Sequence, residues 1–169
     1  MATAALISVE EYLASAWHPD RDFIEGEVRE RTMGEFSHGR LQLNIGTWLK
    51  SREKAWRFRA VTEVRLQIST SRFRIPDLML VSTDAPREQI VRTPPLVCIE
   101  ILSRGDSMRD MMDRLDDYFA LGVPVCWVVD PVRGCGWIAT PGHLAEASDG
   151  VLRAGAIKMP LAEVLENED

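Results

Sequence analysis

Two carboxylates, Asp77 and Glu100, interrupt apolar stretches of the sequence. Asp77 precedes the apolar residues 78–81, and Glu100 lies within the otherwise apolar residues 96–102. A buried carboxylate without a partner is costly, so such residues are usually paired, hydrogen-bonded or bound to metal. Two of them on neighbouring strands would repel each other unless a cation lay between them. A hard ion such as Mg²⁺ or Mn²⁺, bound through carboxylates and water, fits this pattern and could orient a water molecule and stabilise phosphoryl charge.

The same two residues also have an ordinary structural explanation. One carboxylate could form a salt bridge with Arg74 or Arg114, while the other lies at the end of a strand. For either residue alone the two explanations are equally good. Because both stand in apolar, strand-like segments about twenty residues apart, we favour a shared site.

The segments that must position these residues follow from hydrophobic spacing and capping signals. Ser8 and Glu11 form a capping box for a helix that should end near Trp17, and Ser107 and Asp110 form another. Apolar residues at helical spacing predict helices, and those at every second position predict half-buried strands. The predicted elements are a helix over 8–17, two short strands within 22–32, a helix over 37–54, strands over 56–68, 72–81 and 96–102, a helix over 107–121 and a strand over 125–129.

The order of the main elements is helix, strand, strand, strand, helix, strand, which indicates an α/β domain. The connection from the Glu100 strand through a helix to the strand at Trp127 has the length of a right-handed βαβ unit. Residues 136–139 and 151–157 could add edge strands, and Pro160 could open a short last helix. We expect one domain over residues 1–169, a length that suits a single core.

The composition is that of an ordinary globular protein, with 46% hydrophobic and 27% charged residues. No segment is long and apolar enough to span a membrane, and the first six residues lack the features of a signal peptide. We therefore expect a cytoplasmic protein. Cys98 and Cys126 lie in apolar segments and should be small buried residues. With Cys135 and the scattered histidines they do not give the spacing of a zinc site.

The net charge of −6 argues at first against a nucleic-acid partner. Its distribution is uneven, because residues 1–36 hold eight acidic and three basic side chains, whereas residues 50–74 hold eight basic and two acidic ones. This basic stripe (residues 50–74) could contact phosphates, and its candidate residues are Lys50, Arg52, Lys54, Arg72 and Arg74. The alternative, which charge alone favours, is a solvated helix end and hairpin.

An ordered set of short motifs resembles the Uma-two family of putative restriction endonucleases, which belongs to the PD-(D/E)XK nuclease superfamily. In chain order the motifs are Tyr12-Leu13, residues 23–27 (FIEGE), Ser37-His38, Ile75-Pro76-Asp77, residues 99–103 (IEILS), Asp110, Tyr118, Gly122-Val123 and residues 127–131 (WVVDP). A single match such as the Pro-Asp pair is weak, but the ordered set with compatible spacing is specific. The resemblance covers about residues 8–131.

The resemblance implies a restriction-endonuclease-like αβββαβ core with a mixed α+β sheet, here with an N-terminal helix and hairpin and C-terminal edge strands. It also implies one or two divalent ions, Mg²⁺ or Mn²⁺, held by Asp77 and Glu100, and a lysine that positions or activates the attacking water. The superfamily lysine stands two residues after the glutamate, where this chain has Leu102. In the Uma-two family it comes from the following helix, four residues before the tyrosine, where this chain has Arg114.

Arg114 therefore departs from the family pattern. Arginine stays protonated at ordinary pH and cannot act as a base, but it can stabilise charge on a phosphate. It stands four residues after Asp110, so the two could instead pair on the helix surface. A weakened or lost activity is consistent with this replacement.

Three further residues are candidates for accessory roles. Glu63, on the strand before Asp77, could be an additional metal ligand or could face solvent. His38 matches the family at the start of a helix, where it could lie near the site or only cap and pack at the helix end. Glu25 could reach the same cleft or only shape the turn at Gly26.

These features together favour a Mg²⁺-dependent endonuclease that hydrolyses phosphodiester bonds in DNA, with Asp77, Glu100 and Arg114 as its catalytic residues. Two other classes stay open. One is a binding module on the same fold that engages nucleic acid or protein without turnover, and the other is a metal-free structural protein. Because many nucleases cut both strands as pairs, a homodimer is also expected by analogy.

Overall fold

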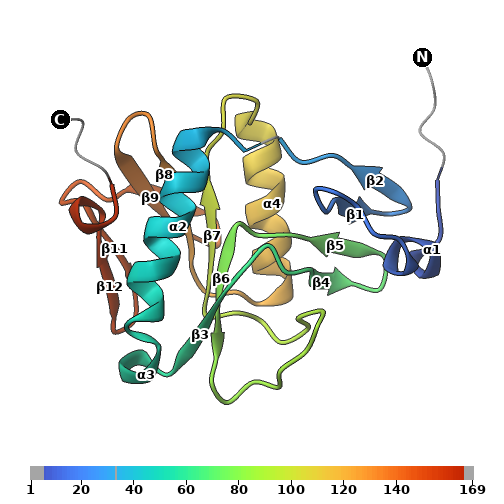
Figure 1. The fold of residues 1–169 in the computed structure, drawn as a ribbon, viewed down its shortest axis with the longest axis horizontal. Coiled ribbons are helices and arrows are strands. Elements are labelled where there is room, and N and C mark those ends of the chain that lie inside the picture. Colours follow the sequence, from blue (N-terminus) through green and yellow to red (C-terminus); the bar gives the residue numbers. More distant parts are fainter. Residues whose placement is uncertain (1–5, 33, 166–169) are drawn as a thin grey trace.

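A six-stranded mixed sheet lies at the centre of the computed structural model, which describes residues 6–32 and 34–165 (Figure 1). Its strand order is β10-β9-β8-β7-β6-β3. Strands β7 and β8 run parallel, and the other neighbours are antiparallel. The strands are β3 (Phe58–Thr62), β6 (Leu78–Ser82), β7 (Val97–Ile101), β8 (Cys126–Asp130), β9 (Cys135–Thr140) and β10 (His143–Glu146).

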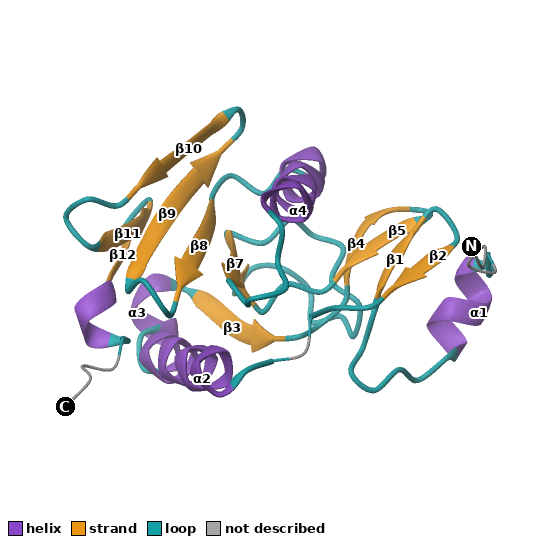
Figure 2. Cartoon of the chain, turned by 90° about the horizontal axis from the view of Figure 1, so that it is seen from above, coloured by secondary structure: helices purple, strands orange, loops and turns teal. Residues whose placement is uncertain are grey.

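Two helices cover opposite faces of this sheet, α2 (Phe36–Lys50) and α4 (Met108–Leu121) (Figure 2). Side chains alternate along a strand, so Ile99 of β7 packs in the cluster on the α2 side, whereas Cys98 packs in the cluster on the α4 side. The same alternation directs Glu100 toward α4, where Tyr118 donates a hydrogen bond to it. The β7-α4-β8 connection between parallel neighbours confirms the predicted βαβ unit.

A smaller antiparallel sheet stands beside the large one, in the order β2-β1-β5-β4 (Figures 1 and 2). Its strands are β1 (Asp22–Ile24), β2 (Glu27–Arg29), β4 (Leu66–Ser69) and β5 (Arg72–Arg74), and helix α1 (Val9–Ala14) packs against it. Tyr12 of α1 stacks on Phe23 with ring centroids 4.8 Å apart, and Phe73 lies against both rings. This aromatic cluster gives the small sheet a core of its own.

The strand predicted over 56–68 is wrong as a single element. Trp56 ends the short helix α3 (Glu53–Trp56), β3 begins at Phe58, and the chain turns at Glu63 before β4 joins the other sheet. Both Arg57 and Glu63 have positive φ, 55° and 52°, which a straight strand does not accommodate. The alternation persists through both turns because each short strand buries one face of its own.

The strand predicted over 72–81 is also two strands. It breaks between β5 and β6, at residues 75–77. Pro76 has no N–H and cannot donate a ladder hydrogen bond, so it does not fit inside a central strand. Asp77 therefore lies just before β6 and not in the middle of a strand.

The helices differ from the prediction mainly in where they end. α1 stops at Ala14, short of Trp17, and α2 stops at Lys50 before the separate α3. Both capping boxes are confirmed in their helix-starting role: the Ser8 hydroxyl accepts from the Glu11 N–H, and the Ser107 hydroxyl accepts from the Asp110 N–H, each at 3.0 Å.

The C-terminal part departs most from the prediction. Residues 151–157 do not form one edge strand. They fall in a separate hairpin of β11 (Val151–Ala154) and β12 (Ile157–Pro160), with Gly155 in the turn at a φ of 58°. Strand β9 contains residues 136–139 and is not an edge, because β10 pairs outside it. Pro160 precedes a 3₁₀ turn, η1 (Leu161–Glu163).

Cys98 and Cys126 are fully buried on adjacent strands, as predicted. None of the helices within the described residues combines the length and hydrophobicity needed to cross a bilayer.

Candidate active site

Asp77 is held just before strand β6 of the large sheet by three parts of the chain. Its Oδ2 accepts a hydrogen bond from the main-chain N–H of Ile101, at 2.7 Å, which ties it to the end of β7. Its Oδ1 accepts from the guanidinium of Arg31, at 2.9 Å. Its carbonyl oxygen accepts from the Gln42 amide of α2, at 3.0 Å. The carboxylate is therefore buried but fully hydrogen-bonded, which offsets the cost of its burial.

Glu100 lies one residue before the Ile101 amide that binds Asp77. Its Oε1 accepts a short hydrogen bond from the Tyr118 hydroxyl, and its Oε2 lies 3.4 Å from Nη1 of Arg114. Burial, followed by the nearby charge of Asp77, raises the pKa of Glu100 to about 7, against the opposing effects of Arg114 and Tyr118. The two carboxylates are thus close enough to repel each other.

Arg114 points from α4 into the site. Its Nη2 lies 3.3 Å from Oδ1 of Asp106, and the other oxygen of Asp106 accepts from the Ser103 N–H at 2.8 Å. The pairing with Asp110 that the helical spacing allowed is not observed, because Asp110 bonds the Ser107 hydroxyl instead, at 2.6 Å. One structural alternative, a salt bridge between a site carboxylate and Arg114, is present at Glu100.

His38 approaches Asp77 from the first turn of α2. Its Nε2 lies 3.4 Å from Oδ1 of Asp77, and its Nδ1 lies 2.9 Å from the Ser103 hydroxyl. Burial lowers the pKa of His38, but the hydrogen bond and charge of Asp77 outweigh it, so that the pKa is raised. The raised pKa means that Asp77 favours the protonated form of His38.

Arg31 is a site residue that sequence reasoning missed, as are Gln42 and Asp106. It lies in the connection from β2 to α2, and its side chain is only 15% exposed. It belongs to an acidic segment and to no periodic pattern, and its only signal is its place between two family motifs, residues 23–27 and Ser37-His38. Tyr118 was expected as a buried family residue, but its role as the donor to Glu100 was not.

Glu63 and Glu25 lie at different distances from this centre. Glu63 is exposed at the bend after β3, where its Oε1 is 3.4 Å from the Gln42 amide and its N–H donates to the Asp77 carbonyl at 3.3 Å. Glu25 accepts from the Ser71 hydroxyl at 2.7 Å within the small sheet. Glu63 is thus adjacent to the site, and Glu25 supports the hairpin.

Many side chains of the basic stripe form ion pairs with acidic residues. Lys50 binds Glu53 at 2.7 Å, and Arg52 lies 3.4 Å from Glu163. Lys54 is exposed on α3. Arg72 and Arg74 turn inward, and both bind Asp117, at 2.8 and 2.6 Å, while Arg74 also binds Asp22. Much of this positive charge is therefore neutralised within the protein.

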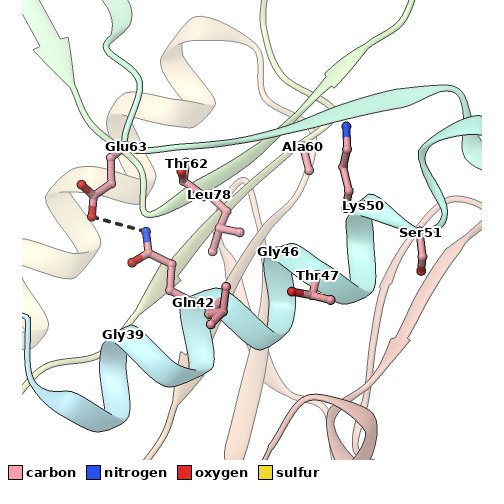
Figure 3. A pocket seen from close by; sticks show the side chains of 11 residues that line it. Gly39, Gln42, Gly46, Thr47, Lys50, Ser51, Ala60, Thr62, Glu63 and Leu78 are labelled. Atoms are coloured by element: carbon pink, nitrogen blue, oxygen red, sulfur yellow. Dashed lines mark hydrogen bonds between the residues drawn. The ribbon is translucent and has the colours of Figure 1, made fainter.

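An open cleft of about 760 Å³ runs between α2 and β3 (Figure 3). Gln42 and Glu63 face each other at one end of it, and Lys50 and Ser51 lie at the other. Because Gln42 also bonds the Asp77 carbonyl, this cleft begins at the edge of the carboxylate site.

The donor set fits a magnesium-like ion and not a closed metal cage. Among residues 6–32 and 34–165, no group of three or more His, Cys, Asp or Glu side chains is arranged to hold a metal. Mg²⁺ commonly binds through one or two carboxylates and keeps several waters, a requirement that Asp77 and Glu100 meet. Their mutual repulsion would also be relieved by a cation.

The fold is that of a restriction-endonuclease-like α+β protein. It is similar to a solved structure described as a "putative nuclease belonging to DUF820 from Anabaena variabilis ATCC 29413", with a TM-score of 0.80 and 21% identity over 94% of this chain and 97% of that chain. The model of the Uma2 family, described as "Putative restriction endonuclease", matches residues 9–151. The chain belongs to this family.

Two other comparisons add little. A DrdV–DNA complex matches 60% of this chain and 9% of that chain, with 16% identity and a TM-score of 0.39, which is too distant to support an argument. No curated protein matches at a significant level.

Proposed function

We propose that this protein is a divalent-metal-dependent endonuclease that hydrolyses phosphodiester bonds in DNA. One observation carries the proposal: two buried carboxylates lie at adjoining positions, because Asp77 accepts from the N–H of the residue after Glu100, and both face arginines, in a member of a putative restriction-endonuclease family. Buried carboxylates whose charges oppose each other in this way are typical of functional sites.

Asp77 and Glu100 would hold the ion, with water filling its remaining positions. When bound, Mg²⁺ or Mn²⁺ would lower the pKa of a water molecule and neutralise charge on a phosphoryl oxygen. The Tyr118 hydroxyl fixes one oxygen of Glu100, and the Ile101 N–H fixes one oxygen of Asp77. A bound cation would approach the remaining oxygens, Oδ1 of Asp77 and Oε2 of Glu100, which face Arg31 and Arg114 in this structure.

Arg114 and His38 supply the other chemistry of the site. Arg114 keeps its charge at any ordinary pH, and Asp106 directs it beside Glu100, where it would stabilise charge on the phosphate. His38 holds its Nε2 near Asp77 while Ser103 contacts its Nδ1, so Nε2 is the atom that would carry a proton. Neither role requires Glu63 or Glu25.

DNA as the substrate and a homodimer as the active form belong to the same proposal. Two copies would present one site to each strand of a duplex. The candidates for backbone contact are Lys50 and Lys54, which are exposed, among the five residues predicted from the basic stripe.

A second function is favoured by one observation, the arginine that stands in the family's lysine position and already pairs with Glu100. On this alternative the chain binds nucleic acid or a protein without turnover. Salt-dependent DNA binding by the wild-type chain without any cleavage would support it.

Calorimetric titration with Mn²⁺ tests the metal site directly. We expect binding to the wild-type chain, its loss in Glu100→Ala, and its retention in Asp84→Asn, which changes an exposed carboxylate that pairs with Arg57 on the surface. A heat signal that is equal in wild type and Glu100→Ala would contradict the site. Circular dichroism checks that each variant is folded.

A further inference from the structure

Arg31 and His38 both face the oxygen of Asp77 that the main chain leaves open, and Arg31 is the closer, at 2.9 Å against 3.4 Å. The Ile101 N–H takes Oδ2, and Arg31 donates to Oδ1 at 2.9 Å. Arg114 lies farther from its own partner, 3.4 Å from Oε2 of Glu100, and has Asp106 as a second partner. A cation that binds between Asp77 and Glu100 therefore competes first with Arg31.

The charges of the site also indicate that an anion joins a bound metal ion. Three carboxylates, those of Asp77, Glu100 and Asp106, face the two guanidiniums of Arg31 and Arg114, so the site carries about one negative charge without a metal ion when all three are ionised. A divalent ion adds two positive charges to a region in which Arg31 is 15% exposed and Asp77 is 5% exposed. Excess charge of one sign is unfavourable in such surroundings unless an anion joins it.

A phosphodiester group is an anion of the right chemistry. Guanidinium groups bind phosphate through paired N–H donors and keep their charge, so a displaced arginine is well suited to it. Arg31 lies in a connection between elements, from β2 to α2, and not within a helix or strand. A change of side-chain rotamer at Arg31 would carry the guanidinium from Asp77 toward a bound phosphate.

We propose that Arg31 acts as a replaceable cation: it neutralises Asp77 in the metal-free protein and transfers to the substrate phosphate when a divalent ion binds. This inference rests on the proposed function. Metal and DNA should therefore each strengthen the binding of the other, because the metal displaces Arg31 from Asp77 and the DNA phosphate gives Arg31 a new partner. Arg31 is thus a binding residue for the phosphate and an internal competitor of the metal.

Two measurements on the same variants test the inference. In calorimetry without DNA, Arg31→Gln should bind Mn²⁺ at least about fivefold more tightly than wild type, a modest coupling for interacting sites. Arg31→Lys keeps the charge but loses the paired donors, and it should lie between the two. Arg29→Gln is the matched control: it also removes one arginine, whose partner Glu27 is on the surface, and it should leave the affinity unchanged.

The second measurement uses a labelled DNA duplex, with Ca²⁺ in place of the cleaving ions. By fluorescence anisotropy, Ca²⁺ should raise the DNA affinity of wild type at least about tenfold over a chelator, and this gain should shrink severalfold in Arg31→Gln. If Arg31→Gln is not folded, Arg31→Lys carries both tests, with smaller changes of the same sign.

The outcomes distinguish a failure of this inference from a failure of the proposed function. Mn²⁺ binding that is equal or weaker in Arg31→Gln would mean that Arg31 only holds Asp77 in place, and it would overturn the inference while wild type still binds metal. An equal gain from Ca²⁺ in both proteins would also overturn it. Failure of wild type to bind Mn²⁺ at all would remove the proposed function and the inference together.

Discussion

At the scale of single residues, each site carboxylate has one oxygen that is fixed by a hydrogen bond and one oxygen that faces an arginine. Main-chain and hydroxyl donors fix Oδ2 of Asp77 and Oε1 of Glu100. Arginines face the remaining oxygens. Positioning one oxygen of a ligand by a second hydrogen bond is how proteins orient metal-binding carboxylates. The same geometry makes Arg114 the cation nearest to Glu100.

Arg114→Ala is expected to lower the rate of DNA cleavage about 100-fold, because it removes a fixed positive charge from the phosphate site. The measurement is the initial rate of plasmid nicking in Mg²⁺. Arg109→Ala, which removes an exposed arginine from the same helix, should leave the rate unchanged. An unaltered rate in Arg114→Ala would contradict the role of Arg114. A gain in Arg114→Lys would instead show that the natural chain is attenuated at this step.

At the scale of elements, the sequence predicts which faces are buried better than it predicts where strands turn. Alternation correctly marked Leu66 and Phe58 as buried, yet these residues lie in different sheets, because the chain turns at Glu63. Periodicity reports burial and not sheet membership. The burial of Asp77 and Glu100 could be predicted, because these two charges stood in apolar segments. Arg31 could not, because only the tertiary fold brings its connection to Asp77.

The turn at Glu63 can be tested by substitution. Its φ of 52° is costly for a β-branched side chain and easy for glycine. Glu63→Val should therefore lower the free energy of unfolding by about 1–2 kcal/mol, while Glu63→Gly stays within about 0.5 kcal/mol of wild type. Urea denaturation measures both. Thr62→Val, one residue earlier at the strand end, is the control, and equal stability of the two Glu63 variants would argue against the turn.

The connection from α3 to β3 gives a pH-dependent prediction. Glu53 accepts from the Ala60 N–H at 2.9 Å and from Lys50 at 2.7 Å. Burial alone would raise the pKa of Glu53, but these hydrogen bonds leave it lowered. Because the folded pKa lies below the unfolded one, the carboxylate stabilises the fold above the unfolded pKa, and this contribution is lost as the pH falls through the folded pKa.

Glu53→Gln should therefore cost about 1 kcal/mol at pH 7, and the difference from wild type should shrink as the pH is lowered. Urea denaturation over a pH series measures it. Glu146→Gln, at an exposed position of β10, should change little at any pH. A difference that grows toward acid pH would contradict the assignment.

At the scale of the whole molecule, the protein is acidic and keeps much of its basic stripe in internal ion pairs. The net charge is −6, and Arg72 and Arg74 bind Asp117 and do not form an open cationic surface. DNA would then be drawn mainly to the carboxylate site, where Arg31, Arg114 and a bound ion supply the positive charge. Non-specific attraction along the surface should be small.

The salt dependence of DNA binding measures this directly. With roughly three or four phosphates neutralised, the logarithm of the affinity should fall with the logarithm of salt concentration with a slope of about −3 to −4. Anisotropy in Ca²⁺ at several salt concentrations gives the slope. A slope near −8 would mean that the whole basic stripe contacts DNA, and Lys54→Gln would then reduce it by about one.

The cleavage of supercoiled plasmid by wild type and Asp77→Asn is the most direct test of the central claim, that Asp77 and Glu100 form a metal-dependent nuclease site. Wild type in Mg²⁺ or Mn²⁺ should convert the plasmid to nicked and linear forms and should be inactive with a chelator. Asp77→Asn, which keeps the size of the side chain, should be inactive while folded, and Asp84→Asn should be fully active. Wild-type protein that cuts no nucleic acid with either ion, or Asp77→Asn that cuts as well as wild type, would contradict it.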